Sequence, residues 1–374
     1  MRILYVTTIS NTVNAFLVPH IQMLIESGHH VDIACNITQP LKEKLKDLGC
    51  DVFDIGFQRS PLTLANLKAF IKIKKYIEDG KYDLVHTHTP ISSFITRLAC
   101  KKFNNIKMVY TVHGYHFYKG SSFMSWKVYY TLEKWLSKYT DCIITINEED
   151  YTASIENKFK SKQITLMNGV GIDLNDFVPS TKKQKRELRE IYGFKVNDFI
   201  LICVAELNQN KHQGFLIEIA FYLKKIIPEL KILLVGTGNG ELQYKNLAKK
   251  LCVEDQIKFL GYRNDVSSLM KLSDIAVSAS RREGLPVNVM EAMATGLPLV
   301  VSDCRGNRDL VKHNENGYIV AQNDKQKFSY YIEKLYNDKA MRRKFSLESL
   351  NQIQKYDLKN VLGKLKDVHS KIAT

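Results

Sequence analysis

The sequence predicts an α/β protein with two doubly wound, Rossmann-like domains that face a central cleft. Three observations support this fold class. Short runs that are apolar on both faces alternate with longer amphipathic stretches, as in parallel sheets covered by helices. The pattern stops at a polar, basic segment and then starts again. The length of 374 residues suits two domains of about 100–200 residues each.

The expected strands form two series, one before and one after this segment. The first series is residues 3–7, 31–35, 84–88, 108–112 and 142–146, and the second is residues 200–205, 232–235, 257–260, 275–278 and 299–302. Helices are expected in the gaps, for example at residues 62–76 and 123–139. Binding loops should therefore lie at the carboxyl ends of the strands, which share one edge of each sheet.

The basic segment at residues 178–198 marks the expected domain boundary. We expect a first domain at residues 1–177, a second at residues 178–356, and a helix at residues 357–374 that packs back on the first. The segment is poor in apolar residues, which favours a solvated linker that enters a helix; an anion site is the alternative. Its clustered cations are Lys182, Lys183, Lys185, Arg186 and Arg189.

The charge balance points to an anionic partner. Lys and Arg total 54 against 39 Asp and Glu, a net charge of +15, which favours nucleic acid, an acidic membrane surface or phosphate-bearing substrates. No helix-turn-helix, zinc-knuckle or RNP pattern occurs, so no nucleic acid is expected.

No apolar run is long enough to span a membrane, and the first residues resemble a strand rather than a signal peptide. Seven scattered cysteines favour buried, reduced thiols in a cytoplasmic protein.

The most informative motif is SRREGLPVNVMEAMA at residues 280–294, directly after an expected strand. Glu283 falls in the loop at the strand end, Gly284 and Leu285 can offer free amides where a helix begins, and Glu291 lies about two turns along that helix. Carboxylates accept paired hydrogen bonds from vicinal hydroxyls, and helix N-termini favour phosphate. The motif therefore suits a sugar, a diphosphate and a ribose in line.

A glycine-rich turn, VGTGNG at residues 235–240, follows another expected strand. Gly236 and Gly238 would allow backbone amides to approach a phosphate. The spacing is GxGxG rather than the GxGxxG of dinucleotide sites. A tight turn and a nucleotide-phosphate contact both stay open on this pattern.

These strings resemble the family-4 retaining glycosyltransferases of the GT-B fold, whose EX7E motif matches Glu283 and Glu291. The strings VHTHTP, TVHGYHF, NGV and FLGYRNDV, beginning at residues 85, 111, 168 and 259, fit the same family in order. The chain is similar to the capsule and exopolysaccharide branch. The resemblance implies transfer of a sugar, an N-acetylated amino sugar for this branch, from a UDP-sugar to an undecaprenyl-diphosphate-linked saccharide. A UDP-sugar 2-epimerase on the same fold is the alternative.

The resemblance also implies roles residue by residue. Glu283 would sit near the reacting carbon, Lys211 would hold the diphosphate, and His113 would reach from the acceptor-binding first domain to the donor sugar. Other donor-binding residues in the second domain would be Gly236, Gly238, Tyr262, Arg263, Arg282, Gly284, Leu285, Pro286, Asn288 and Glu291. Acceptor and first-domain contacts would be Asn11, Asn14, His88, His116 and Lys119.

No metal and no cofactor is expected. The chain has no DxD triplet, and Lys211 with the amides of Gly284 and Leu285 would stabilise the departing diphosphate. Glu206 is a departure, since many family members have Arg there, and it would repel a diphosphate unless it points away. His86 and His88 alternate at a strand end, which favours one buried, hydrogen-bonded ring and one at the rim over a metal pair.

The surplus of positive charge is expected to bind an anionic membrane surface as well as the donor diphosphate. Trp126 and Trp135 lie nine residues apart in one expected helix, on opposite faces. The core side is predicted to carry Met124, Val128, Leu132, Trp135, Leu136 and Tyr139, while Phe123, Trp126 and Tyr130 are predicted outward among lysines. With the lysines of the helix at residues 62–76, this face would bind an anionic inner leaflet. The protein would then be cytoplasmic and peripheral on the inner face of the cell membrane; an ordinary solvated face is the alternative. The sequence carries no signal for an oligomeric state.

Overall fold

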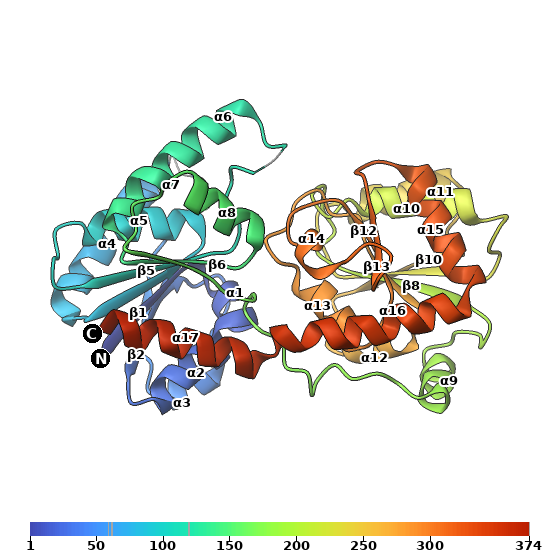
Figure 1. The fold of residues 1–374 in the computed structure, drawn as a ribbon, viewed down its shortest axis with the longest axis horizontal. Helices are drawn as coiled ribbons and strands as arrows, with labels where there is room; N and C mark the ends of the chain where they lie inside the picture. Colours follow the sequence, from blue (N-terminus) through green and yellow to red (C-terminus); the bar gives the residue numbers. More distant parts are fainter. Residues whose placement is uncertain (59, 61–62, 119, 374) are drawn as a thin grey trace. The chain divides into compact units, whose positions relative to one another are not determined.

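The computed structural model describes the chain except for residues 59, 61–62, 119 and 374. It contains two compact units (Figure 1). The first unit consists of residues 1–171 and the C-terminal helix, and the second of residues 172–357. Each unit has one parallel sheet with helices on both faces, which confirms the prediction of an α/β protein with two doubly wound, Rossmann-like domains.

The first unit has a seven-stranded sheet in the order β3-β2-β1-β4-β5-β6-β7. The order reverses between β1 and β4, as in Rossmann-like sheets. All five strands expected in this half are present, whereas β3 and β7 were not expected. Both lie at sheet edges and are partly exposed, so neither forms a fully apolar run. The bounds are β1 Arg2–Ile9, β2 His30–Asn36, β3 Val52–Asp54, β4 Leu84–His88, β5 Lys107–Val112, β6 Cys142–Thr145 and β7 Gln163–Leu166.

Helices α4, α5 and α7 cover one face of this sheet, and α2 and α17 cover the other (Figure 1). Alternate residues of β1 enter the two cores, with Leu4 packing toward α4 and α5 and Tyr5 toward α2 and α17. The helices of this unit are α1 Ser10–Thr12, η1 Val13–Leu17, α2 Val18–Glu26, α3 Glu43–Asp47, α4 Leu64–Gly80, α5 Pro90–Cys100, α6 Phe123–Ser125, η2 Trp126–Tyr130, α7 Thr131–Leu136, η3 Ser137–Tyr139, α8 Glu148–Glu156 and α17 Leu358–Ala373.

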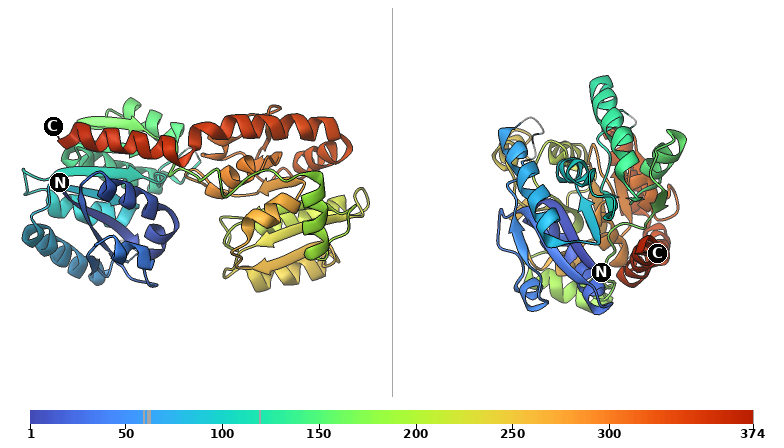
Figure 2. Two further views of the ribbon diagram at one scale, coloured as in Figure 1. Left: turned by 90° about the horizontal axis from the view of Figure 1, so that it is seen from below. Right: turned by 90° about the vertical axis from the view of Figure 1, so that its left-hand side faces the viewer.

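The C-terminal helix α17 lies beside α2 (Figures 1 and 2). It buries Val361, Leu365 and Val368, spaced as one helix face, in the core that contains Tyr5. The unit boundary falls before Ile172 rather than at residue 177. Ile172 donates its amide to the Tyr356 carbonyl at 3.0 Å, which ties it to the second unit.

The second unit has a six-stranded sheet in the order β10-β9-β8-β11-β12-β13, which reverses between β8 and β11. Its five expected strands are present, and β13 was not expected. The strands are β8 Phe199–Val204, β9 Leu230–Val235, β10 Ile257–Gly261, β11 Ile275–Ser278, β12 Leu299–Ser302 and β13 Gly317–Val320. The helices are α9 Lys182–Ile191, α10 Gln213–Leu223, α11 Glu241–Lys250, α12 Val266–Leu272, α13 Val287–Ala294, α14 Asn307–Leu310, α15 Lys325–Asn337, α16 Lys339–Gln352 and η4 Ile353–Tyr356.

The basic segment enters helix α9. Thr181 and Gln184 form a capping box at the N-terminus of this helix. Two of its cations face inward. Lys185 and Arg189 each lie 2.7 Å from a carboxylate oxygen of Asp274. Asp274 therefore balances one of these two positive charges and holds both side chains within the unit, which favours the linker-and-helix interpretation over an anion site.

The helical stretch at residues 123–139 is present, but its faces differ from the expectation. The π-helical segment η2 widens one turn, which rotates the residues before it relative to those after it. Met124 and Val128, expected in the core, are exposed. Trp126 and Tyr130, expected outward, pack on Phe117 with ring centroids 5.2 and 5.5 Å away. The prediction is wrong at these four residues, whereas Phe123 is exposed and Leu136 is buried, as predicted.

Within the described part of the chain, no helix combines the length and apolar character that a membrane crossing requires. All seven cysteines are free. Six are buried, as the apolar runs predict, and Cys252 is exposed.

Candidate functional site

The predicted catalytic residues of the second unit meet where the strand order reverses. Lys211 follows β8 and Glu283 follows β11, and these strands are neighbours in the sheet. Ligands of open α/β sheets bind at this position, outside the carboxyl ends of the strands. The Lys211 Nζ lies 2.6 Å from Glu283 Oε1, and both side chains are largely buried. The structure thus brings a cation and a carboxylate together at the expected edge.

Hydrogen bonds of the backbone, with each other and with two asparagine side chains, hold the two loops that carry this pair. The Lys211 amide donates to Asn208 Oδ1 at 2.9 Å. Across the loops, the Arg281 amide donates to the Asn210 carbonyl at 2.8 Å, and Asn210 Nδ2 donates to the Arg282 carbonyl at 3.0 Å. One backbone–backbone bond and one bond from the Asn210 side chain therefore cross-link the loops that carry the ion pair.

Helix α13 begins beside the pair, with Pro286 as its N-cap residue. Among the described residues, no protein group accepts a hydrogen bond from the amides of Gly284 or Leu285. Asn288 Nδ2 donates to the Val204 carbonyl at 2.7 Å, which fixes the first turn of α13 against the end of β8. Free amides before a fixed helix N-terminus suit an anionic group.

Glu291 lies on α13 beyond this N-terminus and is half-buried. Desolvation raises the pKa of Glu291 to about 7. Among the described residues, no side chain forms a hydrogen bond or ion pair with its carboxyl group. A carboxyl group that is desolvated and unpaired can accept hydrogen bonds from a ligand's hydroxyls.

The glycine-rich turn is explained by backbone crowding. A Cβ on Gly236 would lie 2.2 Å from the Ala205 carbonyl oxygen, and one on Gly238 would lie 2.3 Å from that of Leu207. Gly236 also has a φ of +135°. The tight-turn interpretation accounts for both glycines, and their contact with a phosphate stays a prediction.

Two further donor-site candidates lie at the end of β10. Tyr262 is 77% exposed, so its ring is available to a ligand. Arg263 Nε donates to Asp265 Oδ1 at 2.7 Å, and this guanidinium, with the Tyr192 hydroxyl, holds the pKa of Asp265 well below its usual value. The charge of Arg263 is therefore balanced by Asp265. The roles of Arg263 and Arg282 toward a donor stay predictions. Glu206, the departure from the family pattern, is exposed.

In the first unit, His88 ends β4 and His113 follows β5, and their rings form a hydrogen bond. His88 Nδ1 lies 3.1 Å from His113 Nε2. Desolvation, with a smaller effect from His20, lowers the pKa of His113 to about 4, so its ring is neutral near pH 7. His88 is buried, contrary to the expectation of one ring at the rim.

His86 belongs to the interior of the unit. Its Nδ1 lies 3.1 Å from His369 Nε2 on α17, and its Nε2 lies 2.8 Å from the Thr111 hydroxyl. Because both ring nitrogens have partners, His86 is a hydrogen-bonded core residue. Local sequence could not indicate His369 as the partner of His86, because the two residues are 283 positions apart in the chain.

Asn11 and Asn14 hold the loop after β1 against residues 38–42. Asn11 Oδ1 accepts from the Thr38 hydroxyl at 3.0 Å, and Asn14 bonds the Pro40 carbonyl and the Lys42 amide. The His116 ring lies against that of Tyr129, with ring centroids 4.9 Å apart and the ring planes tilted by 34°. Lys119 lies outside the described residues.

Two family models match the chain, one for each unit. "Glycosyl transferase 4-like" matches residues 2–147, and "Glycosyl transferases group 1" matches residues 184–351. The "Putative glycosyltransferase EpsD" of Bacillus subtilis is 36% identical over 99% of this chain and 96% of its own length. The chain belongs to glycosyltransferase family 4.

Two further comparisons agree with this family-4 assignment. An Escherichia coli protein named "UDP-Gal:alpha-D-GlcNAc-diphosphoundecaprenol alpha-1,3-galactosyltransferase" is 29% identical over 86% of this chain and 83% of its own length. The crystal structure of Anabaena Alr3699/HepE in complex with UDP superposes with a TM-score of 0.82, covering 99% of this chain and 100% of that one at 21% identity. This structural likeness shows the GT-B fold.

Two residues of this family-4 glycosyltransferase were missed by the sequence analysis. Arg305 is buried and donates from Nε to the Glu283 carbonyl at 3.0 Å. Gly306 has a φ of +76°, and a Cβ there would lie 2.4 Å from the Gly284 carbonyl oxygen. Both follow β12, the strand beside β11, and an Arg-Gly pair at a strand end was the available signal.

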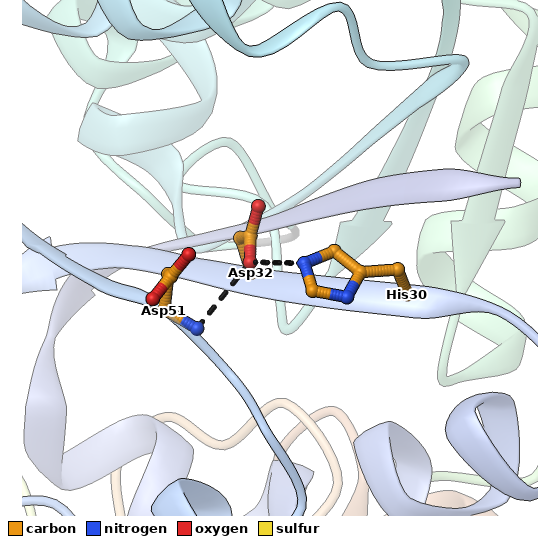
Figure 3. Close-up of side chains that lie close together, drawn as sticks. All are labelled: His30, Asp32 and Asp51. Carbon is orange, nitrogen blue, oxygen red and sulfur yellow. Dashed lines mark hydrogen bonds and ion pairs between the residues drawn. The ribbon is translucent and has the colours of Figure 1, made fainter.

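One group of side chains in the described residues has the spacing of metal ligands: His30, Asp32 and Asp51 (Figure 3). Asp32 is buried and already paired, since Arg2 lies 2.9 Å from Oδ2 and the Tyr82 hydroxyl donates to the same oxygen at 2.7 Å. A cation there would compete with the Arg2 guanidinium. We assign the group to the stability of the β1–β2 edge.

Proposed function

We propose that this enzyme is a retaining, metal-independent glycosyltransferase that moves an N-acetylated amino sugar from a UDP-sugar to an undecaprenyl-diphosphate-linked saccharide in capsular or exopolysaccharide synthesis. The observation that carries the proposal is the Lys211–Glu283 pair, 2.6 Å apart beside the N-terminus of α13. The donor-site roles of Glu283, Lys211 and Glu291 are part of the same proposal.

The pair suits a nucleotide-sugar donor chemically. The Lys211 ammonium and the free amides of Gly284 and Leu285 can bind a diphosphate whose charge grows as the bond to the sugar breaks. Glu283 can then accept hydrogen bonds from sugar hydroxyls near the reacting carbon. Glu291, farther along α13, can accept hydrogen bonds from the ribose.

Retention follows if the acceptor attacks the face that the diphosphate leaves. The bond from the anomeric carbon to the phosphate oxygen breaks, and a bond to the acceptor oxygen forms. The leaving phosphate oxygen takes the proton of the acceptor hydroxyl, so no separate base is needed. Lys211 and the α13 N-terminus supply positive charge for this step, which supports a mechanism without a metal.

The donor and acceptor classes rest on the relatives. The name of the Escherichia coli relative gives UDP-galactose as donor and a diphosphoundecaprenol-linked sugar as acceptor. HepE was crystallised with UDP. An enzyme with a lipid-linked acceptor works at a membrane surface, and exposed Phe123, Met124 and Val128 beside Lys127 support peripheral contact with anionic lipid on the cytoplasmic side.

The test uses radiolabelled UDP-sugars with an undecaprenyl-diphosphate-linked saccharide. We expect UDP release with label entering the lipid fraction, greatest for an N-acetylated sugar, undiminished by EDTA, and with the anomeric configuration retained by NMR. A changed sugar nucleotide without UDP release would instead identify a 2-epimerase. Loss of transfer with EDTA, restored by Mg²⁺, would refute the metal-independent mechanism.

A further inference from the structure

An apolar groove lies between α4 and α5 in the first unit. Its volume is about 550 Å³, and seven of its nine lining residues are apolar. Small-molecule sites typically have volumes of about 300–1,000 Å³. One of the two polar lining residues, Asn66, is already occupied, because it bonds the backbone of Gln58 and Ser60. The groove therefore suits an aliphatic ligand rather than a saccharide.

The outer face of α4 continues the groove as an apolar stripe. Leu64, Leu67 and Ile71 follow helical spacing and are 83%, 59% and 63% exposed. Exposed lysines flank the stripe, and residues 64–75 contain four lysines and no acidic residue. The patch thus combines apolar contact area with a charge opposite to that of a phosphate-bearing lipid.

The groove reaches the edge of the sheet where ligands bind. Ile91 lines it from the first turn of α5, two residues after Thr89. The Thr89 hydroxyl bonds that of Thr8 at 2.7 Å, which joins the carboxyl ends of β4 and β1 where the strand order reverses. A ligand with its polar end at this edge can therefore extend an aliphatic chain into the groove.

We propose that the α4–α5 groove binds the isoprenoid chain of a lipid-diphosphate acceptor. The proposal rests on the proposed function for the class of acceptor. A bilayer surface would contact only the outward side chains of α4, whereas Phe70 and Phe94 line the groove from two helices and are half-buried. A single chain between the helices contacts both walls, and the lysines beside it attract the diphosphate.

The test measures binding without catalysis, by calorimetry with geranylgeranyl diphosphate and with inorganic diphosphate. We expect the wild-type protein to bind the isoprenoid at least tenfold more tightly. The double variant Leu64→Gln/Leu67→Gln should lose this difference. Leu347→Gln is the matched control, since Leu347 is 61% exposed on α16, and it should keep the difference. A second double variant, Leu64→Ala/Leu67→Ala, removes the apolar area without adding an amide.

Equal affinity of the wild-type protein for both probes would overturn the proposal. The proposal would also be overturned if Leu64→Gln/Leu67→Gln no longer pellets with phosphatidylglycerol vesicles but still binds geranylgeranyl diphosphate as the wild type does. The outer face of α4 would then be a bilayer contact. Isoprenoid binding without sugar transfer would contradict the proposed function and leave the groove assignment standing. Transfer with equal affinity for the two probes would contradict the groove alone.

Discussion

Glu291 shows how burial sets the charge state of a candidate binding residue. Its position, eight residues after Glu283, follows from the motif, but its pKa of about 7 depends on burial that the motif does not encode. The same holds for the 2.6 Å contact of Lys211 with Glu283, because their loops are far apart in sequence. At this scale the sequence predicted identities, and the tertiary packing set charge states and partners.

The raised pKa of Glu291 predicts pH-dependent UDP binding. The ionised carboxylate is the stronger acceptor for ribose hydroxyls, and it predominates only above pH 7. Affinity for UDP should therefore rise about tenfold from pH 6 to pH 8. Calorimetric titrations at these two values measure the change.

Glu291→Gln is the control for this pH dependence, because the phosphate groups of UDP also titrate near pH 6. The variant should bind more weakly at pH 8 and show a clearly smaller pH dependence. An unchanged pH dependence in Glu291→Gln would show that another group is responsible.

At the scale of elements, fully buried strands were predictable and partly exposed ones were not. The run at residues 275–278 gave β11 with its observed bounds, since both of its faces are covered. Edge strand β7 is partly exposed throughout and gives no such run. The π-helical η2 changed the outward face of its helix, because its widened turn shifts the 3.6-residue period on which the prediction relied.

The turn after β12 constrains the loop that carries Glu283. Gly306→Ala should destabilise the second unit by about 3 kcal/mol, since it adds a clash with the Gly284 carbonyl to the cost of positive φ. It should also lower turnover by displacing Glu283. Thermal unfolding and transfer assays measure both effects.

Gly193→Ala is the matched control for this clash. Gly193 has a φ of +74°, close to the +76° of Gly306, and a Cβ there meets no atom within 4 Å. It should cost only about 1 kcal/mol and leave turnover unchanged. Equal effects of the two substitutions would refute the role assigned to the clash.

At the scale of the molecule, the buried histidines predict that the first unit is acid-sensitive. Desolvation lowers the pKa of each below the unfolded value of about 6.5, so the unfolded chain binds more protons as the pH falls below 6.5. The free energy of unfolding of the first unit therefore keeps its full value above pH 6.5. Below that pH it falls by up to about 1.4 kcal/mol per pH unit for each ring. These residues are His20, His86, His88, His113 and His369.

Calorimetry at pH 7.5 and pH 5.0 should show a larger downward shift for the first unit than for the second. His369→Gln should reduce the pH dependence of unfolding by about one proton, since it removes one of the titrating rings. Equal shifts in both transitions would refute this origin.

The net charge of +15 is also a property of the whole molecule, and the folded structure places its cations in different surroundings. Lys185 and Arg189 neutralise Asp274 inside the second unit, and Lys211 belongs to the candidate donor site. Lys68, Lys72 and Lys75 of α4 are exposed beside an apolar stripe. Composition predicted an anionic partner, and the distribution of the cations favours a lipid diphosphate together with a donor diphosphate.

In the proposed mechanism, Glu283 acts on the donor sugar while Lys211 and the start of α13 hold the diphosphate. Parallel measurement of UDP affinity and sugar transfer in Glu283→Gln tests it most directly. Transfer should fall at least about a thousandfold, while the Kd for UDP changes less than about threefold, because Gln keeps the shape of the side chain but removes its charge. Loss of UDP affinity in proportion to turnover, or retention of turnover, would contradict the assignment.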